Sequence, residues 1–374
     1  MIEIIEVVSD KDMKDFLRLP FDLYQNCSEW VPPITAEEKA VFDTDKNPVF
    51  QNAKAKLFLA KRNGKVIGRI AALINWIEIK EQQKHKVRFG WYDVVDELEV
   101  SKKLLEAVAD WGKDHNMRYI EGPMGFSNMD KAGLLTEGFE HKNTMITWYH
   151  YPYQKEHLEK LGYEKQAEWV EFQIKIFDQK DAPEKVKKFA SVIAERYQLE
   201  PLEFRSRKAL LPYVDEMFDL LNKTYDRLQT FVPIQPHQVA HYKEKYFRYI
   251  HPDFIKCVAD KEGKLVAFAI TMPSFSEALK KVNGKLFPFG FLHILKAQRK
   301  NHRASFYLIG IDPEYQNKGV TAMIFQAMQD LFNKRGITDV ETNPELEENS
   351  AIQKMWKNYD HKLHKRRRTY KKNL

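Results

Sequence analysis

The chain has 374 residues and a formal net charge of +7, and 43% of its residues are hydrophobic and 13% aromatic. This composition excludes a disordered or collagen-like chain, and the length predicts two domains of ordinary size. Because no run of 18 uncharged apolar residues occurs and the first residues have no signal-peptide pattern, we expect a soluble, cytoplasmic protein.

The first half of the chain predicts a hairpin followed by alternating strands and helices. Two β-prone runs within residues 58–72 meet at Asn63-Gly64, the pair typical of a two-residue turn. Behind this hairpin we expect a strand at 87–95, a helix at 100–115, a strand at 117–122 and a short helix that ends at Leu161-Gly162-Tyr163.

Two connections in this half bear on function. Residues 95–100, just before the predicted helix, contain three carboxylates and no glycine, so we expect this helix N-terminus to repel phosphate. The connection after the strand at 117–122 contains Gly122, Gly125, Gly133 and Gly138. It either lets the backbone approach a ligand or forms several turns. Its apolar and polar candidates for substrate binding are Phe126 and Asn128.

The second half repeats this order of elements. Residues 254–271 form another predicted hairpin about 200 residues later, followed by a strand at 306–311, a helix at 320–335, a strand at 338–342 and a helix that opens near Asn349. We therefore expect two tandem domains of mixed α/β (α+β) class, each a twisted mixed sheet flanked by helices. The polar run at 179–184 predicts a division into residues 1–180 and 181–374.

The segment Phe287–Leu295 and the histidine within it are each open to more than one interpretation. The run Phe287–Leu295 has three Phe in five residues, and it either lines a channel for an acyl chain or forms a buried strand or helix. His293, within that run, is a candidate general base or a lining residue. Cys27 and Cys257 have no metal-ligand spacing, so we expect buried thiols and no metal.

The segment 306–322 is the most informative one, because an apolar strand passes through a turn with glycine directly into an amphipathic helix. The unpaired N–H groups and the dipole of such a helix N-terminus bind anionic phosphate. An ordinary strand–turn–helix connection would have the same pattern.

The order Gln316-x-x-Gly319-x-Thr321-Ala322 resembles the diphosphate loop of the GNAT acyltransferases, although Thr321 replaces the usual Gly or Ala. Phrases along the chain, among them Trp30-Val-Pro-Pro33, Glu121-Gly-Pro123 and Lys365-Arg-Arg-Arg368, are similar to those of the YghO and bacterial ceramide synthase-like group of tandem GNAT proteins. This resemblance spans nearly the whole chain.

The resemblance implies transfer of an acyl group from acyl-CoA or acetyl-CoA to an amine, with a long-chain sphingoid base as one possible acceptor. The diphosphate would lie on the loop, and the backbone of Ile309 and Ile311 would pair with the pantetheine arm. The implied loop residues are Gln316, Asn317, Lys318, Gly319, Val320, Thr321 and Ala322.

The implied catalytic groups are less clear from the sequence. Glu341 and His293 are the candidate general bases. The family's last helix begins with an Asn and has an acidic Tyr two turns later. Here Asn349 keeps the first position as a coenzyme A contact or a helix cap, but Trp356 replaces the Tyr. Tyr359 or a water molecule would have to supply the proton.

Basic residues concentrate between Lys362 and Lys372, either as a solvated strand or as a contact for something acidic. An anionic cofactor or the inner face of a membrane is a better partner than nucleic acid, because no nucleic-acid motif accompanies the charge. Two other functions remain open: a protein that binds acyl-CoA or lipid without turnover, and a peptidyltransferase of the twin-GNAT type that uses aminoacyl-tRNA. The sequence does not predict the oligomeric state.

Overall fold

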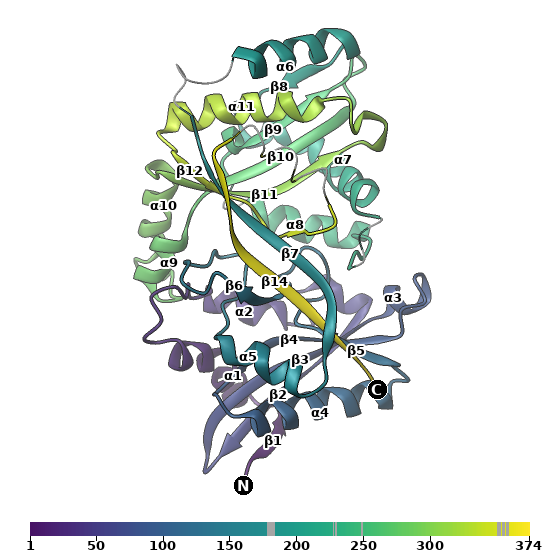
Figure 1. The fold of residues 1–374 in the computed structure, drawn as a ribbon, viewed down its shortest axis with the longest axis vertical. Helices are drawn as coiled ribbons and strands as arrows, with labels where there is room; N and C mark the ends of the chain where they lie inside the picture. Colours follow the sequence, from purple (N-terminus) through teal and green to yellow (C-terminus); the bar gives the residue numbers. More distant parts are fainter. Residues whose placement is uncertain are drawn as a thin grey trace. The chain divides into compact units, whose positions relative to one another are not determined.

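The computed structural model describes residues 1–177, 184–226, 228, 230–247, 250–349, 353, 356 and 359–374. The chain forms two compact units (Figure 1). The first contains Met1–Val170, Phe275–His293 and His364–Leu374, and the second contains Glu171–Ser274 and Ile294–Leu363. Neither unit is one continuous stretch. The division predicted at residues 180 and 181 falls outside the described residues and stays a prediction.

The first unit is a mixed sheet with helices against it. Its strand order is β1-β2-β3-β4-β5-β14-β7, and β4 and β5 are parallel while the neighbouring hairpin strands are antiparallel. Its elements up to β7 are β1 (Glu3–Glu6), α1 (Asp10–Leu23), α2 (Thr35–Val41), β2 (Ala53–Arg62), β3 (Lys65–Asn75), α3 (Trp76–Lys80), β4 (Lys86–Val94), α4 (Leu98–Asp114), β5 (Tyr119–Gly122), β6 (Leu134–Glu137), α5 (Pro152–Lys160) and β7 (Glu164–Lys175).

Local sequence explains most of these elements. Asn63 and Gly64 both have positive φ, 50° and 77°, which gives the turn that matches the twist of β2 and β3. Helix α4 buries Val100, Leu104 and Val108, one stripe at helical spacing, in a core cluster with residues of β2, β3 and β4. The predicted hairpin, strands and helices of this half are thus confirmed.

A group of buried charges joins α3, β4 and β5. The Arg88 guanidinium contacts both carboxylate oxygens of Glu78 at 2.7 and 2.8 Å and donates to the Gly125 carbonyl at 2.8 Å. Lys86 lies between Glu78 and Glu121, 3.0 Å from each. Although burial opposes ionisation, the Arg88 and Lys86 charges hold the pKa of Glu78 below its usual value. The network fixes the start of the glycine-rich connection to the sheet.

The basic C-terminal run is a strand that begins in the second unit and lies in the first unit from His364 onwards. Strand β14 (His361–Asn373) pairs with β5 and β6 in antiparallel fashion. Lys365 and Arg367 are buried, at 1% and 0% exposure, and Lys365 donates to the Lys142 carbonyl at 2.8 Å. Arg368 contacts Glu168 at 3.3 Å. The interpretation of the run as a strand is confirmed. Its interpretation as a solvated strand is wrong for these residues, because a backbone carbonyl contacts Lys365 and a carboxylate contacts Arg368 in place of water.

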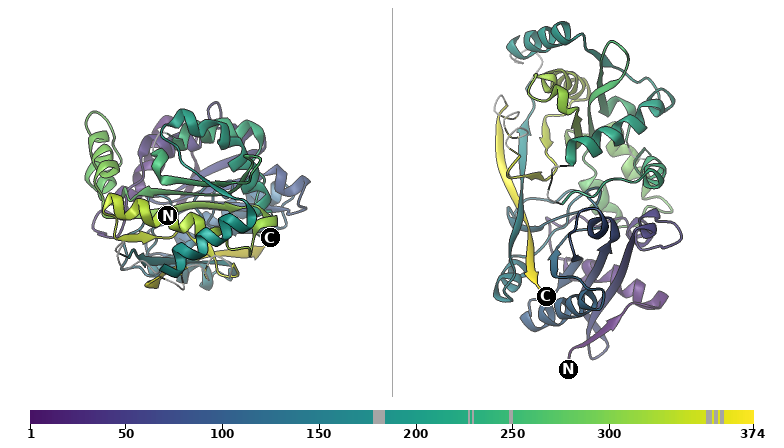
Figure 2. Two further views of the ribbon diagram at one scale, coloured as in Figure 1. Left: turned by 90° about the horizontal axis from the view of Figure 1, so that it is seen from above. Right: turned by 90° about the vertical axis from the view of Figure 1, so that its right-hand side faces the viewer.

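The second unit has the strand order β7-β12-β11-β10-β9-β8. Helices α7 and α11 both pack on its strands (Figure 2). The elements are α6 (Glu184–Tyr197), β8 (Glu200–Leu202), α7 (Arg207–Tyr225), α8 (Pro236–Phe247), β9 (Ile255–Ala259), β10 (Leu265–Pro273), α9 (Ser276–Val282, in the first unit), α10 (Phe291–Arg299, which begins in the first unit), β11 (Arg303–Ile311), α11 (Val320–Arg335), β12 (Asp339–Glu341) and β13 (Glu345–Leu346).

The second half also follows its sequence pattern. The hairpin β9–β10, strand β11, helix α11 and strand β12 confirm the predicted order, so the expected pair of mixed α/β units is present. The helix predicted near Asn349 lies mostly outside the described residues. Within the described part of the chain, no helix combines the length and apolar character needed to span a bilayer.

Candidate functional site

The candidate site lies in the second unit, where β11 and β12 separate. These parallel strands pair only through Arg303–Ser305 and Asp339–Glu341. From Phe306 to Ile311, the described residues place no strand beside this edge of β11, while β10 pairs along the other edge. A strand edge without a neighbour offers backbone groups to an extended ligand.

Side chains from other elements meet the backbone of β11 at this edge. Carbonyls of alternate residues in a strand face the same edge. The Tyr307 carbonyl accepts a bond from Asn343 Nδ2 at 2.8 Å, and the Ile309 carbonyl accepts one from the Tyr225 hydroxyl at 3.0 Å. The Ile311 carbonyl accepts bonds from Thr224 at 3.1 Å and Gln316 at 3.2 Å. Polar side chains of α7, of the turn before α11 and of the connection after β12 therefore bond to these three carbonyls.

The ladder between β10 and β11 contains a bulge. Ile270 pairs with Leu308, but the next residue of β10, Thr271, pairs with Phe306, so Tyr307 has no partner in β10. A bulge leaves a residue out of the ladder and redirects its backbone groups, and bulges are common beside active sites. This one lies at the position where β11 and β12 diverge.

The turn after β11 has the geometry of an anion cradle. Gly319 is the N-cap of α11 with φ of 82°, and no described side chain caps this helix end. Asn317 also has positive φ, 61°, and residues 316–318 are exposed. The N–H groups of the first turn, with Val320 and Thr321 at its start, are therefore not used by a side-chain cap. A Cβ at Gly319 would come within 2.9 Å of Phe189 on α6.

A half-buried carboxyl group, that of Glu345, lies beside Trp356, which packs next to the bulge. Trp356 Nε1 donates to the two carboxylate oxygens of Glu345 at 3.1 and 3.3 Å, and the Trp356 ring packs against Phe306 with 5.3 Å between ring centroids. Burial raises the pKa of Glu345 to about 8, and the Glu171 carboxylate adds to the increase, while hydrogen bonds from Trp356 and Thr342 oppose it. Glu345 is therefore a carboxyl group that exchanges protons near neutral pH.

Tyr225 is the second titratable group of this site. Burial raises the pKa of Tyr225 to about 12, and the negative charge of Glu345 contributes to the increase, so the two groups are close enough to interact. Neither residue was a candidate from the sequence. Glu345 carried the weak signal of a carboxylate four positions after Glu341, but Tyr225 carried none, because its role depends on where the end of α7 meets β11.

Trp356 and Tyr359 occupy different surroundings. Trp356 is buried and is the hydrogen-bond donor to Glu345. Tyr359 stacks on Phe177 with 5.4 Å between ring centroids, and burial raises its pKa to about 12. Asn349 is half-buried, and its backbone N–H donates to the Leu346 carbonyl at 2.9 Å. The roles of Tyr359 as an acid and Asn349 as a coenzyme A contact stay predictions.

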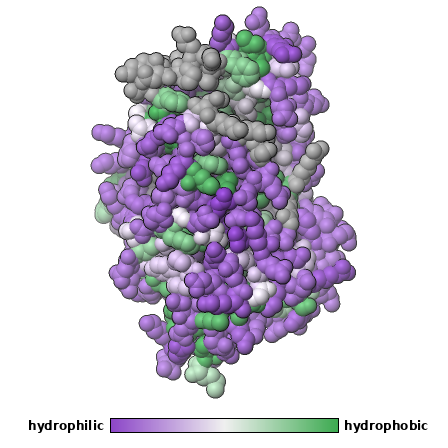
Figure 3. All heavy atoms as spheres, in the orientation of Figure 1, coloured by the Kyte–Doolittle hydropathy of each residue, from purple (hydrophilic) through white to green (hydrophobic). Residues whose placement is uncertain are grey.

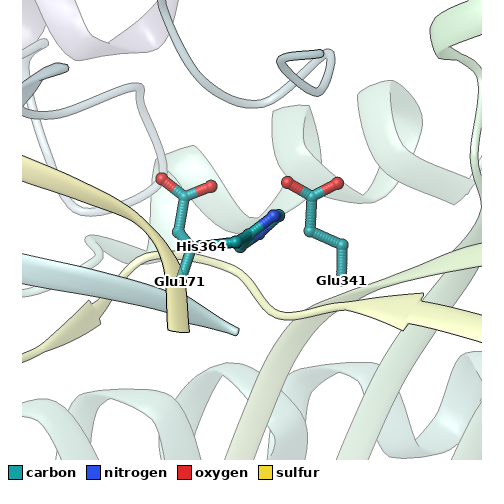
Figure 4. A group of neighbouring side chains, drawn as sticks. All are labelled: Glu171, Glu341 and His364. Atoms are coloured by element: carbon teal, nitrogen blue, oxygen red, sulfur yellow. The ribbon is translucent and has the colours of Figure 1, made fainter. Parts of the chain in front are cut away.

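Glu341 lies on β12, opposite Gln173 of β7. Figure 4 shows its carboxylate and that of Glu171 extending from neighbouring strands in the same direction. Their oxygens come close enough to belong to one possible group of metal ligands. His364, also labelled there, belongs to the first unit. The expectation that the protein binds no metal stays a prediction.

The remaining candidates belong to the first unit. His293 is exposed on α10, outside the part of the chain that forms the site of the second unit. Phe126 is buried in a core cluster, with its ring centroid 5.4 Å from that of Phe50. Asn128 is half-buried, and its Oδ1 atom is buried without a hydrogen-bond partner among the described residues. Asn128 is therefore the better of the two candidates for contact with a substrate.

The first unit differs from the second at the corresponding helix start. Glu97 is the N-cap of α4, and Asp96 and Glu99 lie beside it. Arg62 pairs with Glu97, and Asp96 contacts His157 at 3.2 Å. Carboxylates occupy the end of the helix where an anion would bind. The sequence-based expectation that this unit binds no coenzyme A stays a prediction, and the carboxylates at the start of α4 support it.

Comparison with known proteins identifies relatives of both sequence and fold. Residues 214–359 match the acetyltransferase (GNAT) family model. Protein YghO of Escherichia coli is 26% identical over 98% of this chain and 94% of its own length. Bacterial ceramide synthase of Caulobacter vibrioides is 24% identical over 100% of this chain and 98% of its own length. A tandem GNAT protein from the clavulanic acid biosynthesis pathway has 9% identity and a TM-score of 0.58, with coverage of 100% of this chain and 98% of its own.

Proposed function

We propose that this chain, a tandem GNAT-fold protein similar over its whole length to YghO and bacterial ceramide synthase, transfers an acyl group from a coenzyme A thioester to an amine. One observation carries the proposal. Among the described residues, the second unit combines a helix start at Gly319 without a side-chain cap, an edge of β11 without a neighbouring strand and a half-buried carboxyl at Glu345. These are the parts needed to hold a diphosphate, an extended arm and a transferable proton.

The donor would bind along β11. The N–H groups at the start of α11 would hold the diphosphate, and the backbone around Ile309 and Ile311 would face the pantetheine arm. The carbonyls of these two residues already accept bonds from Tyr225 and Thr224. Because a carbonyl oxygen has two lone pairs, the Ile309 carbonyl can accept a second bond from the arm. The Ile311 carbonyl also accepts a bond from Gln316, so the arm would have to displace one of its two donors there. This arrangement would bring the thioester carbonyl towards the bulge at Tyr307.

We propose Glu345, and not Glu341, as the group that accepts and donates protons during acyl transfer. In its ionised form it accepts one proton from the substrate ammonium and releases it to solvent, which leaves an amine with a free electron pair. The nitrogen then bonds to the thioester carbon. As the carbon–sulfur bond breaks, the second nitrogen proton passes through Glu345 to the departing thiolate. A carboxyl with a pKa of about 8 suits both transfers, because thiols have a pKa near 8.5 and amines a higher one.

The acceptor we propose is a long-chain amine such as a sphingoid base. The support is the name of the Caulobacter relative, whose full length this chain matches. A short-chain or soluble amine is the alternative within the same reaction.

The test is an assay of thiol release and of product. Purified protein is incubated with palmitoyl-CoA or acetyl-CoA, with and without sphinganine, and free thiol is measured beside the lipid product. The proposal expects thiol release that requires both the thioester and the amine. Saturable thioester binding without thiol release, for sphinganine and for a panel of other amines, would instead favour a protein that binds acyl-CoA without turnover.

The cradle can be tested with two matched glycine variants. Gly319 and Gly263 have nearly the same φ, 82° and 81°, but a Cβ would meet Phe189 at Gly319 and nothing within 4 Å at Gly263. We expect Gly319→Ala to weaken coenzyme A binding at least about tenfold, because the helix start or the Phe189 ring beside it must move and the left-handed backbone costs about 1 to 3 kcal/mol. Isothermal titration calorimetry gives the affinity.

Gly263→Ala is the control for strain alone. It lies in the turn between β9 and β10, so we expect lower stability with unchanged coenzyme A affinity. Equal loss of affinity in both variants would argue against a cradle at Gly319 and for a general effect of destabilisation.

A further inference from the structure

An ordered segment of the chain exposes large apolar side chains, which we call the aromatic tip: Phe287, Phe289, Phe291, Leu292 and Leu295. Their exposed fractions are 82%, 72%, 37%, 52% and 41%. The sequence predicted a buried run or channel lining here, and the expectation of burial is wrong for these residues. Figure 3 shows a largely hydrophilic face on which hydrophobic residues form only small patches. Exposed Phe residues so close together therefore call for an explanation.

Backbone bonds hold the aromatic tip in place. The N–H of Phe291 donates to the Leu286 carbonyl at 2.8 Å, and the N–H of Leu292 donates to the Phe289 carbonyl at 3.1 Å. On α10, Ile294 is buried, which leaves the face with Phe291, Leu292 and Leu295 towards solvent. The exposure of the tip thus belongs to a folded segment and not to a frayed end.

All formal charges in the segment that carries the aromatic tip are positive. Residues 278–303 contain no Asp or Glu. They contain seven basic residues, Lys280, Lys281, Lys285, Lys296, Arg299, Lys300 and Arg303. The nearest acidic residue before this segment, Glu277, already pairs with Lys142. Apolar side chains flanked only by Lys and Arg are typical of segments that lie in the interface of a bilayer with anionic headgroups.

We propose that the aromatic tip inserts into the surface of an anionic membrane while the flanking basic residues contact its headgroups. The uniform positive charge argues for this partner. A second copy of this chain would bring the same positive charge to the contact and would be repelled. A negatively charged lipid surface complements both the charge and the apolar side chains. The inference goes beyond the proposed acyl transfer and does not depend on it, since membrane binding is measured without turnover.

The test measures binding of the full-length protein to vesicles. Vesicles of phosphatidylcholine and phosphatidylglycerol at 7:3 are compared with pure phosphatidylcholine by co-sedimentation. We expect tighter binding to the anionic vesicles, weakened by salt. The double variant F287S/F289S should lose at least tenfold in affinity, and K281E/K285E should lose a similar factor on anionic vesicles only. Because all four residues are exposed, we expect the variants to keep the wild-type melting temperature.

Matched controls separate the tip from general surface effects. Val8 is as exposed as Phe287, at 82%, and lies outside the tip, so V8S should bind vesicles like the wild type. K11E/K14E changes the same net charge at exposed positions of α1 and should bind more tightly than K281E/K285E. The proposal is overturned if the wild type ignores anionic vesicles or if F287S/F289S binds as well as V8S. It is also overturned if the wild type dimerises and F287S/F289S abolishes the dimer without changing vesicle binding.

Discussion

Replacement of Glu345 by Gln is expected to lower kcat/KM for acyl transfer at least about 100-fold, the usual contribution of a general base. The wild-type value should rise with pH through an apparent pKa of about 8, because the ionised form of Glu345 is the one that accepts the proton. The Gln side chain neither ionises nor accepts a proton in this pH range, so the rise should disappear in the variant. Steady-state kinetics between pH 6 and 10 measure both effects.

Glu341→Gln is the rival variant in the same experiment. Both carboxylates belong to the second unit, but Glu341 lies on β12 and Glu345 on β13. If Glu341→Gln abolishes the rise with pH and Glu345→Gln keeps it, Glu341 is the base and the assignment of Glu345 is wrong. Unchanged thioester affinity in both variants would show that the loss concerns proton transfer and not donor binding.

Trp356→Phe tests the cause of the pKa separately from the carboxyl itself. The indole N–H bonds to both oxygens of Glu345 and favours the ionised form. Without that donor the pKa of Glu345 should increase further, so the rise in kcat/KM should move to higher pH. We expect reduced activity at pH 7 and near wild-type activity above the new pKa. A profile that stays in place would mean that the hydrogen bond does not control the carboxyl.

The elements that the sequence predicted well are those whose signals are local. Asn63-Gly64 specifies its turn by backbone conformation, and helix α11 follows from the spacing of Val320, Ile324 and Met328. Gly319 could be recognised for the same reason, since a glycine with positive φ directly before the helix defines the end of the turn. Prediction succeeds where neighbours in sequence are also neighbours in space.

The errors concern residues whose partners lie far away in the sequence. Strand β14 resembles a solvated run, but Arg368 is neutralised by Glu168, 200 residues earlier. Glu345 becomes a proton-exchanging group only because Trp356 and the surrounding fold bury it. The exposure of Phe287 was missed for the opposite reason, since apolar composition normally implies burial and only the fold shows which residues have no partner.

Arg88→Met is expected to destabilise the protein by about 3 to 5 kcal/mol, because it removes one partner of a buried ion pair. Glu78 would keep Lys86 but lose both bonds to the guanidinium, and the Gly125 carbonyl would lose its donor. Unfolding in urea, followed by circular dichroism, measures the free energy. Arg62→Met is the control, because the Arg62–Glu97 pair is 37% and 42% exposed, and such pairs contribute about 1 kcal/mol or less.

The double variant Glu78→Met/Arg88→Met distinguishes an unpaired charge from lost packing. It removes both charges and leaves Lys86 with Glu121 at 3.0 Å, so no carboxylate remains buried without its guanidinium. Apolar replacement of a whole buried pair is often neutral, and we therefore expect the double variant to recover at least half of the stability that Arg88→Met loses. If the double variant is no more stable than Arg88→Met, the cost comes from packing and from the lost bond to Gly125. The ion pair itself would then contribute little to the stability of the first unit.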